Sequence, residues 1–267
     1  MRESEPRHAE HADDLTLIET AAREAGEIAM RYFRRDPEVW MKAGDSPVSA
    51  ADLAVDGFLR STLLAARPDY GWLSEETVDN AERLAARRTF VVDPIDGTRA
   101  FIDGRKVWCI SIAVVEEGRS IAGVLDCPAS EEIFTAAVGS GAWMNGGRIS
   151  VRTGYRDIAM GGPKSMINKL PPQLLTRITP HGYIPSLAYR IALVARGTLD
   201  ATFVRPASHD WDLAAADLLL SEAGGQIIDA SMRRPLYAGA DPKLGSLAAG
   251  SGDILRPMAK VLAELPV

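Results

Sequence analysis

Two aspartates at the end of a short apolar run are the residues in this sequence best suited to carry chemistry. The run Thr89–Val92 leads into the segment 93–98, which reads Asp-Pro-Ile-Asp-Gly-Thr. Proline stiffens such a turn, glycine allows an unusual backbone angle, and the amides of Gly97 and Thr98 could face an anion. Carboxylates beside amides indicate a metal ion together with a phosphate. A capped turn is the alternative interpretation, because Asp, Pro, Gly and Thr are all common turn formers.

Acidic residues elsewhere in the chain strengthen the first interpretation. Glu75 and Glu76 follow the apolar run 71–73, and Asp212 stands beside Trp211 where a long apolar helix begins. A solvated loop pair and a helix N-cap are the ordinary explanations for these acids. The segment 49–52 has the spacing of a capping box, which is also a purely structural role for Asp52.

Taken together, these segments resemble the inositol monophosphatase superfamily, in order and approximate spacing over nearly the whole chain. The box at 93–98 is complete, and so is the Trp-Asp-x-Ala-Ala box at 211–215; Ser74 stands before the two glutamates where the family often has Gly. The resemblance implies a magnesium-dependent, lithium-sensitive phosphatase that acts on a small phosphorylated metabolite. It also implies an α+β or α/β fold, layered as an α-β-α-β-α sandwich of the sugar phosphatase type.

The resemblance assigns the metal ligands. One ion would be held by Glu75, Asp93 and the carbonyl of Ile95, and a second by Asp93, Asp96 and Asp212. Oxygen-only ligands suit Mg²⁺, of which we expect two or three ions, with Mn²⁺ as a substitute and Ca²⁺ and Li⁺ as inhibitors. The four histidines of the chain form no zinc spacing such as HExxH, and His209 is expected beside the ligands or on the surface.

The resemblance also assigns the catalytic and substrate-binding residues. Asp52 and Thr98 would orient and deprotonate the attacking water, with Glu76 as a further candidate near a third metal or water position. Without cations, the acids would repel one another strongly, so metal must precede or accompany the phosphate. The expected substrate contacts are Asp96, Gly97, Thr98, Lys164, Arg205 and Asp212.

The identity of the alcohol stays open at this point. The superfamily includes phosphatases of inositol phosphates, fructose bisphosphate, 3′-phosphoadenosine 5′-phosphate and histidinol phosphate. Inositol phosphatases usually have an acid where this chain has Arg205, which moves the prediction toward a bisphosphate nucleotidase or a histidinol phosphatase. Lys164 and Arg190 could add positive charge, although such residues are more often surface ion-pair partners.

Two other functions are alternatives to this prediction. A haloacid-dehalogenase phosphatase would use Asp-x-Asp spacing, whereas this box is Asp-x-x-Asp. Some relatives of inositol monophosphatases assist transcription or ribosomal RNA maturation through protein contacts, a regulatory role that would accompany or replace catalysis.

Composition limits the class of protein. The 267 residues carry 30 Lys and Arg against 36 Asp and Glu, a net charge of −6 that argues against broad nucleic-acid binding. The longest apolar runs fall short of the roughly 20 residues that a membrane helix needs. Cys109 and Cys127 form no CxxC pair, which favours a reducing compartment, and we expect a cytoplasmic protein. The resemblance also implies that the protein is a homodimer.

The elements that must position these residues follow from apolar periodicity. Helices are expected from Asp13 or Asp14 to about 36 and from 49 to 67, followed by an antiparallel meander over 71–151 with hairpin turns at 116–119 and 145–147. Further helices are expected at 169–176, 186–195, 212–223 and 253–265, and short strands at 198–204, 225–228 and 246–249. This divides the chain into a flexible tail at 1–12, a helix pair with a sheet and the metal site at 13–155, and a mixed α/β half at 156–267.

Overall fold

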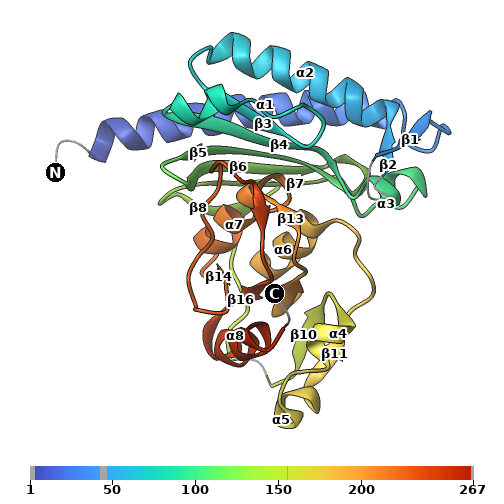
Figure 1. The fold of residues 1–267 in the computed structure, drawn as a ribbon, viewed down its shortest axis with the longest axis vertical. Helices are drawn as coiled ribbons and strands as arrows, with labels where there is room; N and C mark the ends of the chain where they lie inside the picture. The colour runs from blue at the N-terminus through green and yellow to red at the C-terminus, as the bar shows by residue number, and fades with distance from the viewer. Residues whose placement is uncertain (1–3, 43–46, 155, 266–267) are drawn as a thin grey trace.

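Five layers of helix and sheet make up the protein (Figure 1). The computed structural model describes residues 4–42, 47–154 and 156–265. Helices α1 (Ser4–Met30) and α2 (Ala50–Ala66) cover one face of a seven-stranded sheet, and α6 (Leu187–Ala195) and α7 (Asp210–Glu222) cover the other. A five-stranded sheet lies beneath α6 and α7, and α8 (Leu255–Ala263) packs on it from below. This arrangement is the predicted α-β-α-β-α sandwich.

The large sheet runs in chain order. Its strands are β3 (Gly71–Ser74), β4 (Arg88–Asp96), β5 (Cys109–Glu116), β6 (Arg119–Cys127), β7 (Glu132–Ala137), β8 (Gly141–Met144) and β9 (Gly147–Ile149). The β5–β6 and β8–β9 turns place Glu117 and Gly118, and Asn145 and Gly146, at positive φ. Two consecutive positive φ values are typical of tight hairpin turns, so the predicted turn chemistry is confirmed.

The small sheet is mixed. Its order is β11 (Ile178–Pro180), β10 (Ile158–Gly161), β12 (Ala201–Val204), β16 (Leu247–Gly250) and β14 (Gln226–Ile228). The remaining elements are β1 (Val39–Met41), β2 (Pro47–Ser49), β13 (Ser208–His209), β15 (Lys243–Leu244), α3 (Thr98–Ile102), α4 (Lys164–Ile167), α5 (Pro172–Leu175) and the 3₁₀ turns at 81–85, 128–130 and 252–254.

Three predictions about the elements are wrong. Strand β3 pairs parallel to β4, because the segment 75–87 crosses over between them, so the meander is antiparallel only from β4 onward. The predicted helix 169–176 is interrupted, since Pro171 and Pro172 cannot continue a helix, and the structure has the short α4 and α5 instead.

The third error concerns the start of the chain. Helix α1 begins at Ser4, so residues 4–12 are helical rather than the expected flexible tail, and neither Asp13 nor Asp14 caps the helix. Glu10 and Asp14, one turn apart on this helix, both accept hydrogen bonds from the buried guanidinium of Arg88, at 2.7 and 3.1 Å. These contacts tie the polar first turns to the sheet.

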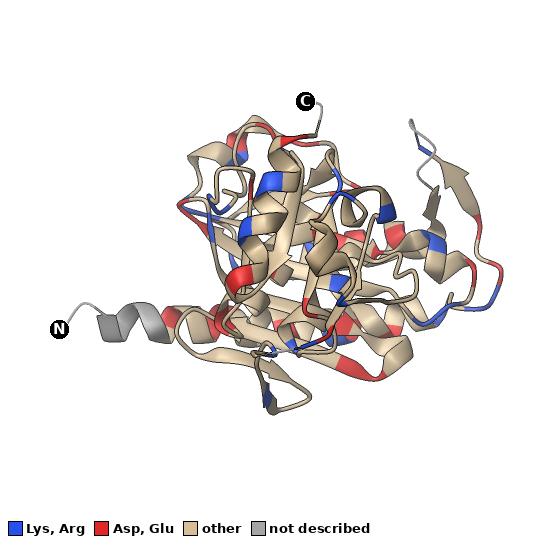
Figure 2. Ribbon diagram, turned by 90° about the horizontal axis from the view of Figure 1, so that it is seen from below, with Lys and Arg blue, Asp and Glu red and all other residues tan. Residues whose placement is uncertain are grey.

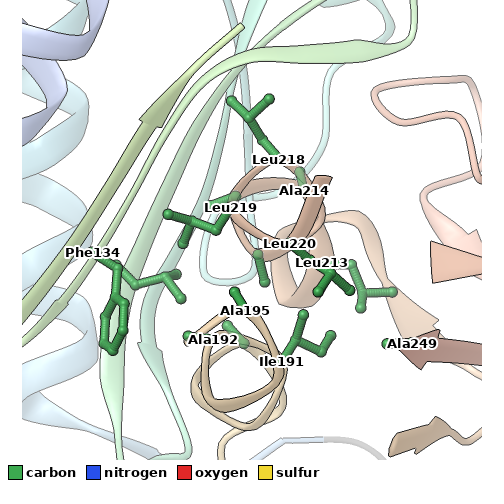
Figure 3. Close-up of a cluster of buried hydrophobic side chains, with 14 of the residues drawn as sticks. Phe134, Ile191, Ala192, Ala195, Leu213, Ala214, Leu218, Leu219, Leu220 and Ala249 are labelled. Atoms are coloured by element: carbon green, nitrogen blue, oxygen red, sulfur yellow. The ribbon is translucent and has the colours of Figure 1, made fainter. Parts of the chain in front are cut away.

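Apolar side chains between the layers hold them together. Figure 3 shows the buried cluster that contains Leu213 and Leu219 of α7, Ile191 of α6 and Phe134 of β7. All four are buried, and α7 is apolar on nearly every side because it lies between two sheets. At roughly 2 kcal/mol for each large buried side chain, this layer makes a substantial contribution to holding the site's elements in place.

Figure 2 shows charged residues of both signs interspersed along the ribbon. Among the residues that the structure describes, none of the helices combines the length and the apolar character needed to cross a membrane.

Candidate active site

A bulge in the large sheet brings the two aspartates of the 93–98 box to the same side. In a regular strand, residues three apart point to opposite faces. Here Asp93 pairs with Ser111 and Asp96 with Cys109, so three steps on β4 match two steps on β5. Pro94, which has no amide hydrogen to donate, lies within the bulge. The extra residue turns both carboxylates toward one point.

Asp96 is fixed by the start of helix α6. Its carboxylate accepts hydrogen bonds from the hydroxyl of Ser186 at 2.6 Å, the amide of Ala188 at 2.6 Å and the amide of Leu187 at 3.2 Å. Burial raises the pKa of Asp96 to about 6, although these hydrogen bonds oppose the rise. A short helix therefore supplies its unpaired amides to a carboxylate that lies 91 and 92 residues earlier in the chain.

Asp212 completes a cluster of three carboxylates. It lies in the first turn of α7, where the backbone amide of His209 donates to Asp212 at 2.7 Å. One oxygen each from Asp93, Asp96 and Asp212 lies within 4.8 Å of the others. Such a cluster of oxygens can hold a hard divalent cation. His209 is not part of the cluster. Its ring stacks on the ring of Trp211, with 4.6 Å between the two ring centroids.

Burial and mutual repulsion act on these acids together. The pKa values of Asp93 and Asp212 are raised well above their ordinary range, first by burial and then by the charges of neighbouring acids, Glu75 among them. A bound cation would replace this repulsion by attraction and lower both pKa values. The cluster is therefore costly to ionise by itself and suited to binding positive charge.

A second pair of side chains links a hydroxyl to a buried carboxylate. Thr98 Oγ1 lies 3.1 Å from Asp52 Oδ1 and 3.1 Å from the carbonyl oxygen of Ile95. The other oxygen of Asp52 accepts from the amide and hydroxyl of Ser49, at 2.8 and 2.6 Å, which is the predicted capping box. Burial raises the pKa of Asp52 despite these hydrogen bonds. Asp52 therefore caps α2 and faces Thr98 at once.

Glu75 and Glu76 share a lysine. The ammonium of Lys42 lies 3.0 Å from Glu75 and 2.6 Å from Glu76. Burial raises the pKa of Glu76 to about 7, and the charge of Lys42 only partly offsets this. Glu75 lines the same cavity as the three clustered aspartates but stands outside their 4.8 Å group. An ion held by Glu75 would have to compete with Lys42.

A cavity of about 210 Å³ opens on this constellation. The described residues that line it are Pro47, Glu75, Asp93, Ile95, Asp96, Gly97, Thr98, Arg99, Tyr183, Pro185 and Asp212. Lys164 and Arg205, expected to contact substrate, are exposed and are not in this lining. Asp52 and Glu76 are not in the lining either. Lys164 begins α4 and Arg205 follows β12, and both elements belong to the region of the small sheet.

Gly97 allows the two walls of the cavity to meet. Its φ is +97°, in the left-handed region that favours glycine, and a Cβ there would lie 3.1 Å from the Cβ of Ser186. The box of β4 and the loop before α6 can approach this closely only because position 97 has no side chain.

Several residues of the site were not predicted as such from the sequence. Ser186 was expected only as a helix start, yet its hydroxyl holds Asp96. Lys42 gave no signal, because nothing in the sequence indicates its distance from Glu75. Arg99 follows the box directly and Tyr183 lies in an irregular loop, so neither stands out before the fold is known.

A buried carboxylate cluster beside a hydroxyl, in a layered sandwich of helices and sheets, is an arrangement that can hold a divalent cation. Comparison with known proteins identifies the family. The model of the inositol monophosphatase family matches residues 11–264. The chain therefore belongs to the inositol monophosphatase family.

Individual relatives agree with this assignment. The chain is 30% identical to the inositol monophosphatase of Dictyostelium discoideum over 253 residues, which cover 90% of each protein. It is 32% identical to the histidinol-phosphatase of Chlorobaculum parvum over 238 residues, which cover 85% of this chain and 89% of that one. The IMPase of Thermotoga maritima has a similar structure, with a TM-score of 0.82 and 28% identity over 94% of this chain and 97% of that one. Membership of this family indicates a phosphatase acting on small phosphorylated substrates.

Proposed function

We propose that the protein hydrolyses the phosphate monoester of a small soluble metabolite with the help of Mg²⁺. The observation that carries this proposal is the convergence of Asp93, Asp96 and Asp212 within 4.8 Å in one cavity with Thr98. The donor set fits the metal, because carboxylate and carbonyl oxygens are the ligands that Mg²⁺ prefers. Glu75 and the carbonyl of Ile95 are the further ligands that we propose. Mg²⁺, when bound, would supply positive charge for the phosphoryl oxygens and lower the pKa of water.

The residues of the chain would handle the proton. The hydroxyl of Thr98 can accept a hydrogen bond from a water molecule while donating its own proton toward Asp52 at 3.1 Å. Because burial raises the pKa of Asp52, its carboxylate is a better proton acceptor than an ordinary aspartate. Glu76 is a further candidate acceptor, held 2.6 Å from Lys42. No side chain needs to become phosphorylated in this scheme.

Binding and orientation of the phosphate would fall to the turn after β4. Gly97 is the N-cap of the short helix α3, which begins at Thr98, and both residues line the cavity beside Asp96 and Asp212. We propose that these four residues contact the phosphoryl group. Lys164 and Arg205 remain predictions as substrate contacts, and their exposed positions outside the cavity lining weigh against them.

Phosphate release from inositol 1-phosphate, adenosine 3′,5′-bisphosphate and histidinol phosphate tests the proposal. We expect Mg²⁺-dependent turnover of at least one ester, loss of activity with a chelator, partial replacement by Mn²⁺, and inhibition by Ca²⁺ and Li⁺. Trapping of a phosphorylated enzyme would instead indicate the haloacid-dehalogenase mechanism. Metal-independent turnover, or none with any ester, would contradict the proposal.

The family resemblance also supports a homodimer and a cytoplasmic location. Cys109 and Cys127 are both buried free thiols, as expected in a reducing compartment. We propose both properties, and sedimentation analysis together with fractionation of the source cells would check them.

A further inference from the structure

A second cavity lies beside helix α1. It has a volume of about 580 Å³ and is bounded by α1, the end of β6, the start of β7 and the β8–β9 turn. The described residues that line it are Arg23, Gly26, Glu27, Met30, Asp126, Pro128, Glu131, Glu132, Ile133 and Asn145. None of these described residues lines the cavity of the candidate active site. A ligand bound here would therefore occupy a site of its own.

Asp126 is the one buried polar side chain among the described residues of this lining. Only 7% of the residue is exposed, and none of the described residues donates a hydrogen bond to its carboxylate or forms an ion pair with it. The charge of Arg23 acts on Asp126, but the guanidinium of Arg23 is paired with Glu19 at 2.8 Å. A buried carboxylate without a donor is unfavourable, because it has lost its water and has no partner instead. It presents an unsatisfied acceptor to a ligand in the cavity.

Gly26 makes room for this carboxylate. It lies inside α1, which continues to Met30, and the interior of a helix ordinarily disfavours glycine relative to alanine. A Cβ at position 26 would collide with Oδ2 of Asp126. The carboxylate therefore lies directly against the backbone of α1, in a place that any other residue at position 26 would fill.

The charged groups around Asp126 give the cavity an excess of negative charge. Glu27 of α1 and Glu131, which precedes β7, are exposed members of the lining. Glu132 also lines the cavity, but its carboxylate is held by hydrogen bonds from helix α6 and its C-cap, at 2.8 and 2.6 Å. Arg23 is the cation among these described residues. One buried acid and two exposed acids therefore face a single guanidinium that another acid already holds.

An aliphatic ammonium ion fits this lining better than a metal ion does. A divalent metal ion needs several oxygens within a few ångströms, and among the described residues the acids that converge in this way are those of the active-site cluster. The second cavity instead combines its acids with the apolar side chains of Met30, Pro128 and Ile133. An alkyl chain can lie along such side chains while its ammonium group donates to a carboxylate.

We propose that this cavity binds a small aliphatic diammonium ion, with one ammonium group donating to Asp126 and the other placed among the exposed acids Glu27 and Glu131. The proposal does not depend on the proposed phosphatase activity. Burial raises the pKa of Asp126 to about 7, so part of the protein holds a proton there at neutral pH. Binding of the cation would release this proton from Asp126, because the carboxylate must ionise to pair with the ammonium group.

Calorimetric titration with 1,4-diaminobutane at pH 8 tests the proposal. Excess Mg²⁺ keeps the active-site carboxylates from binding the amine, and we expect saturable binding at one site per chain. Asp126→Asn should weaken this binding by about 10- to 100-fold, the range for one hydrogen bond between charged groups. Gly26→Ala should weaken it at least as much, because the added Cβ displaces the carboxylate. Glu24→Gln removes an exposed acid of α1 outside the lining and, as the matched control, should bind like the native protein.

The chemistry of the ligand and the pH give independent readouts. 1-Aminobutane should bind at least about 10-fold more weakly, because it has no second ammonium group for the exposed acids. 1,4-Butanediol, which has no charge, should not bind. Arg23 and Glu27 of α1 and Glu131 before β7 are the charged groups that face Asp126. Affinity should fall by roughly 100-fold from pH 8 to pH 5, because pH 5 is two units below the pKa of about 7 of Asp126. Titration near pH 7 in buffers of different ionisation enthalpy should report the released proton.

Several outcomes would overturn the proposal. They are the absence of saturable binding, binding that Asp126→Asn leaves unchanged, and equal affinity for 1-aminobutane and 1,4-diaminobutane. Circular dichroism checks the fold of each variant, and Asp126→Asn should fold at least as well as the native protein, because it removes an unpaired buried charge. Diamine binding without hydrolysis of any ester would refute the phosphatase alone, whereas hydrolysis without diamine binding would refute this inference alone.

Discussion

Replacing Asp93 by Asn separates the stability of the protein from its activity. Asp93 is buried and its pKa is raised well above the ordinary range by burial and by the charges of Glu75, Asp96 and Asp212. Asn has nearly the same shape, and its amide oxygen can still accept the hydrogen bond that the amide of Ile95 donates at 3.0 Å. We expect Asp93→Asn to abolish hydrolysis and to leave the fold intact.

The magnitude follows from the spacing of the cluster. The oxygens of the cluster lie within 4.8 Å of one another, and two unit charges at that greatest separation repel by about 3 kcal/mol at an effective dielectric constant of about 20. Asp93 has two such neighbours in the cluster, and partial protonation relieves some of the repulsion. In a chelator, we therefore expect the variant to have a free energy of unfolding about 1 to 3 kcal/mol above that of the native protein.

Urea unfolding with chelator and with Mg²⁺ is the assay. A ligand at 100 times its dissociation constant stabilises the native state by about 2.7 kcal/mol, so Mg²⁺ should stabilise the native protein strongly and Asp93→Asn much less. Asp253→Asn, which removes an exposed charge from the 3₁₀ turn at 252–254, is the control and should behave like the native protein. The metal cluster would be refuted if Asp93→Asn were less stable than the native protein in chelator, or if Mg²⁺ stabilised it as much as the native protein. Substantial Mg²⁺-dependent turnover by the folded Asp93→Asn variant would refute the role of the cluster in hydrolysis.

Two further predictions concern stability and backbone geometry. Burial raises the pKa of Asp126 from 3.8 to about 7, a difference worth up to about 4 kcal/mol. Because the folded state holds this proton more tightly than the unfolded state, the free-energy cost of ionising the buried Asp126 is absent below pH 4 and grows as the pH rises to 7. Asp126→Asn should therefore stabilise the protein by about 2 kcal/mol more at pH 8 than at pH 5 in thermal or urea unfolding. A stabilisation that does not depend on pH would contradict this prediction. Gly97→Ala should cost about 1 to 3 kcal/mol, because of its φ of +97° and the 3.1 Å contact with Ser186. It should also reduce phosphate release at least tenfold, and activity and stability close to native values would show that the loop before α6 can move without harm.

The sequence alone predicted those features of the fold that depend on residues close to one another in the chain. The capping box at Ser49 and Asp52 and the positive-φ turns at 117–118 and 145–146 depend on neighbours in the chain, and all are present. The 93–98 box stood out by its residue types and its place after an apolar run. The layers and the ligand roles within the box followed from a resemblance that covers most of the chain.

The remaining features depend on distant contacts. The parallel pairing of β3 with β4 results from the crossover at 75–87, which hydrophobic alternation does not reveal. Helix α1 extends to Ser4, and its acids Glu10 and Asp14 meet Arg88, a residue more than 70 positions away. The bulge at Pro94 and Ile95, which aligns Asp93 with Asp96, requires knowledge of the pairing with β5.

Main-chain amides, rather than side chains, make up two of the three hydrogen bonds from α6 to Asp96. The amides of Leu187 and Ala188 donate whatever side chains these positions carry. Evolution, or a protein engineer, can therefore exchange Tyr183 or Pro185, which line the cavity just before α6, while these two amides continue to hold Asp96. Such a division between an invariant skeleton and replaceable lining is a physical basis on which one scaffold can come to serve phosphatases of different substrate preference.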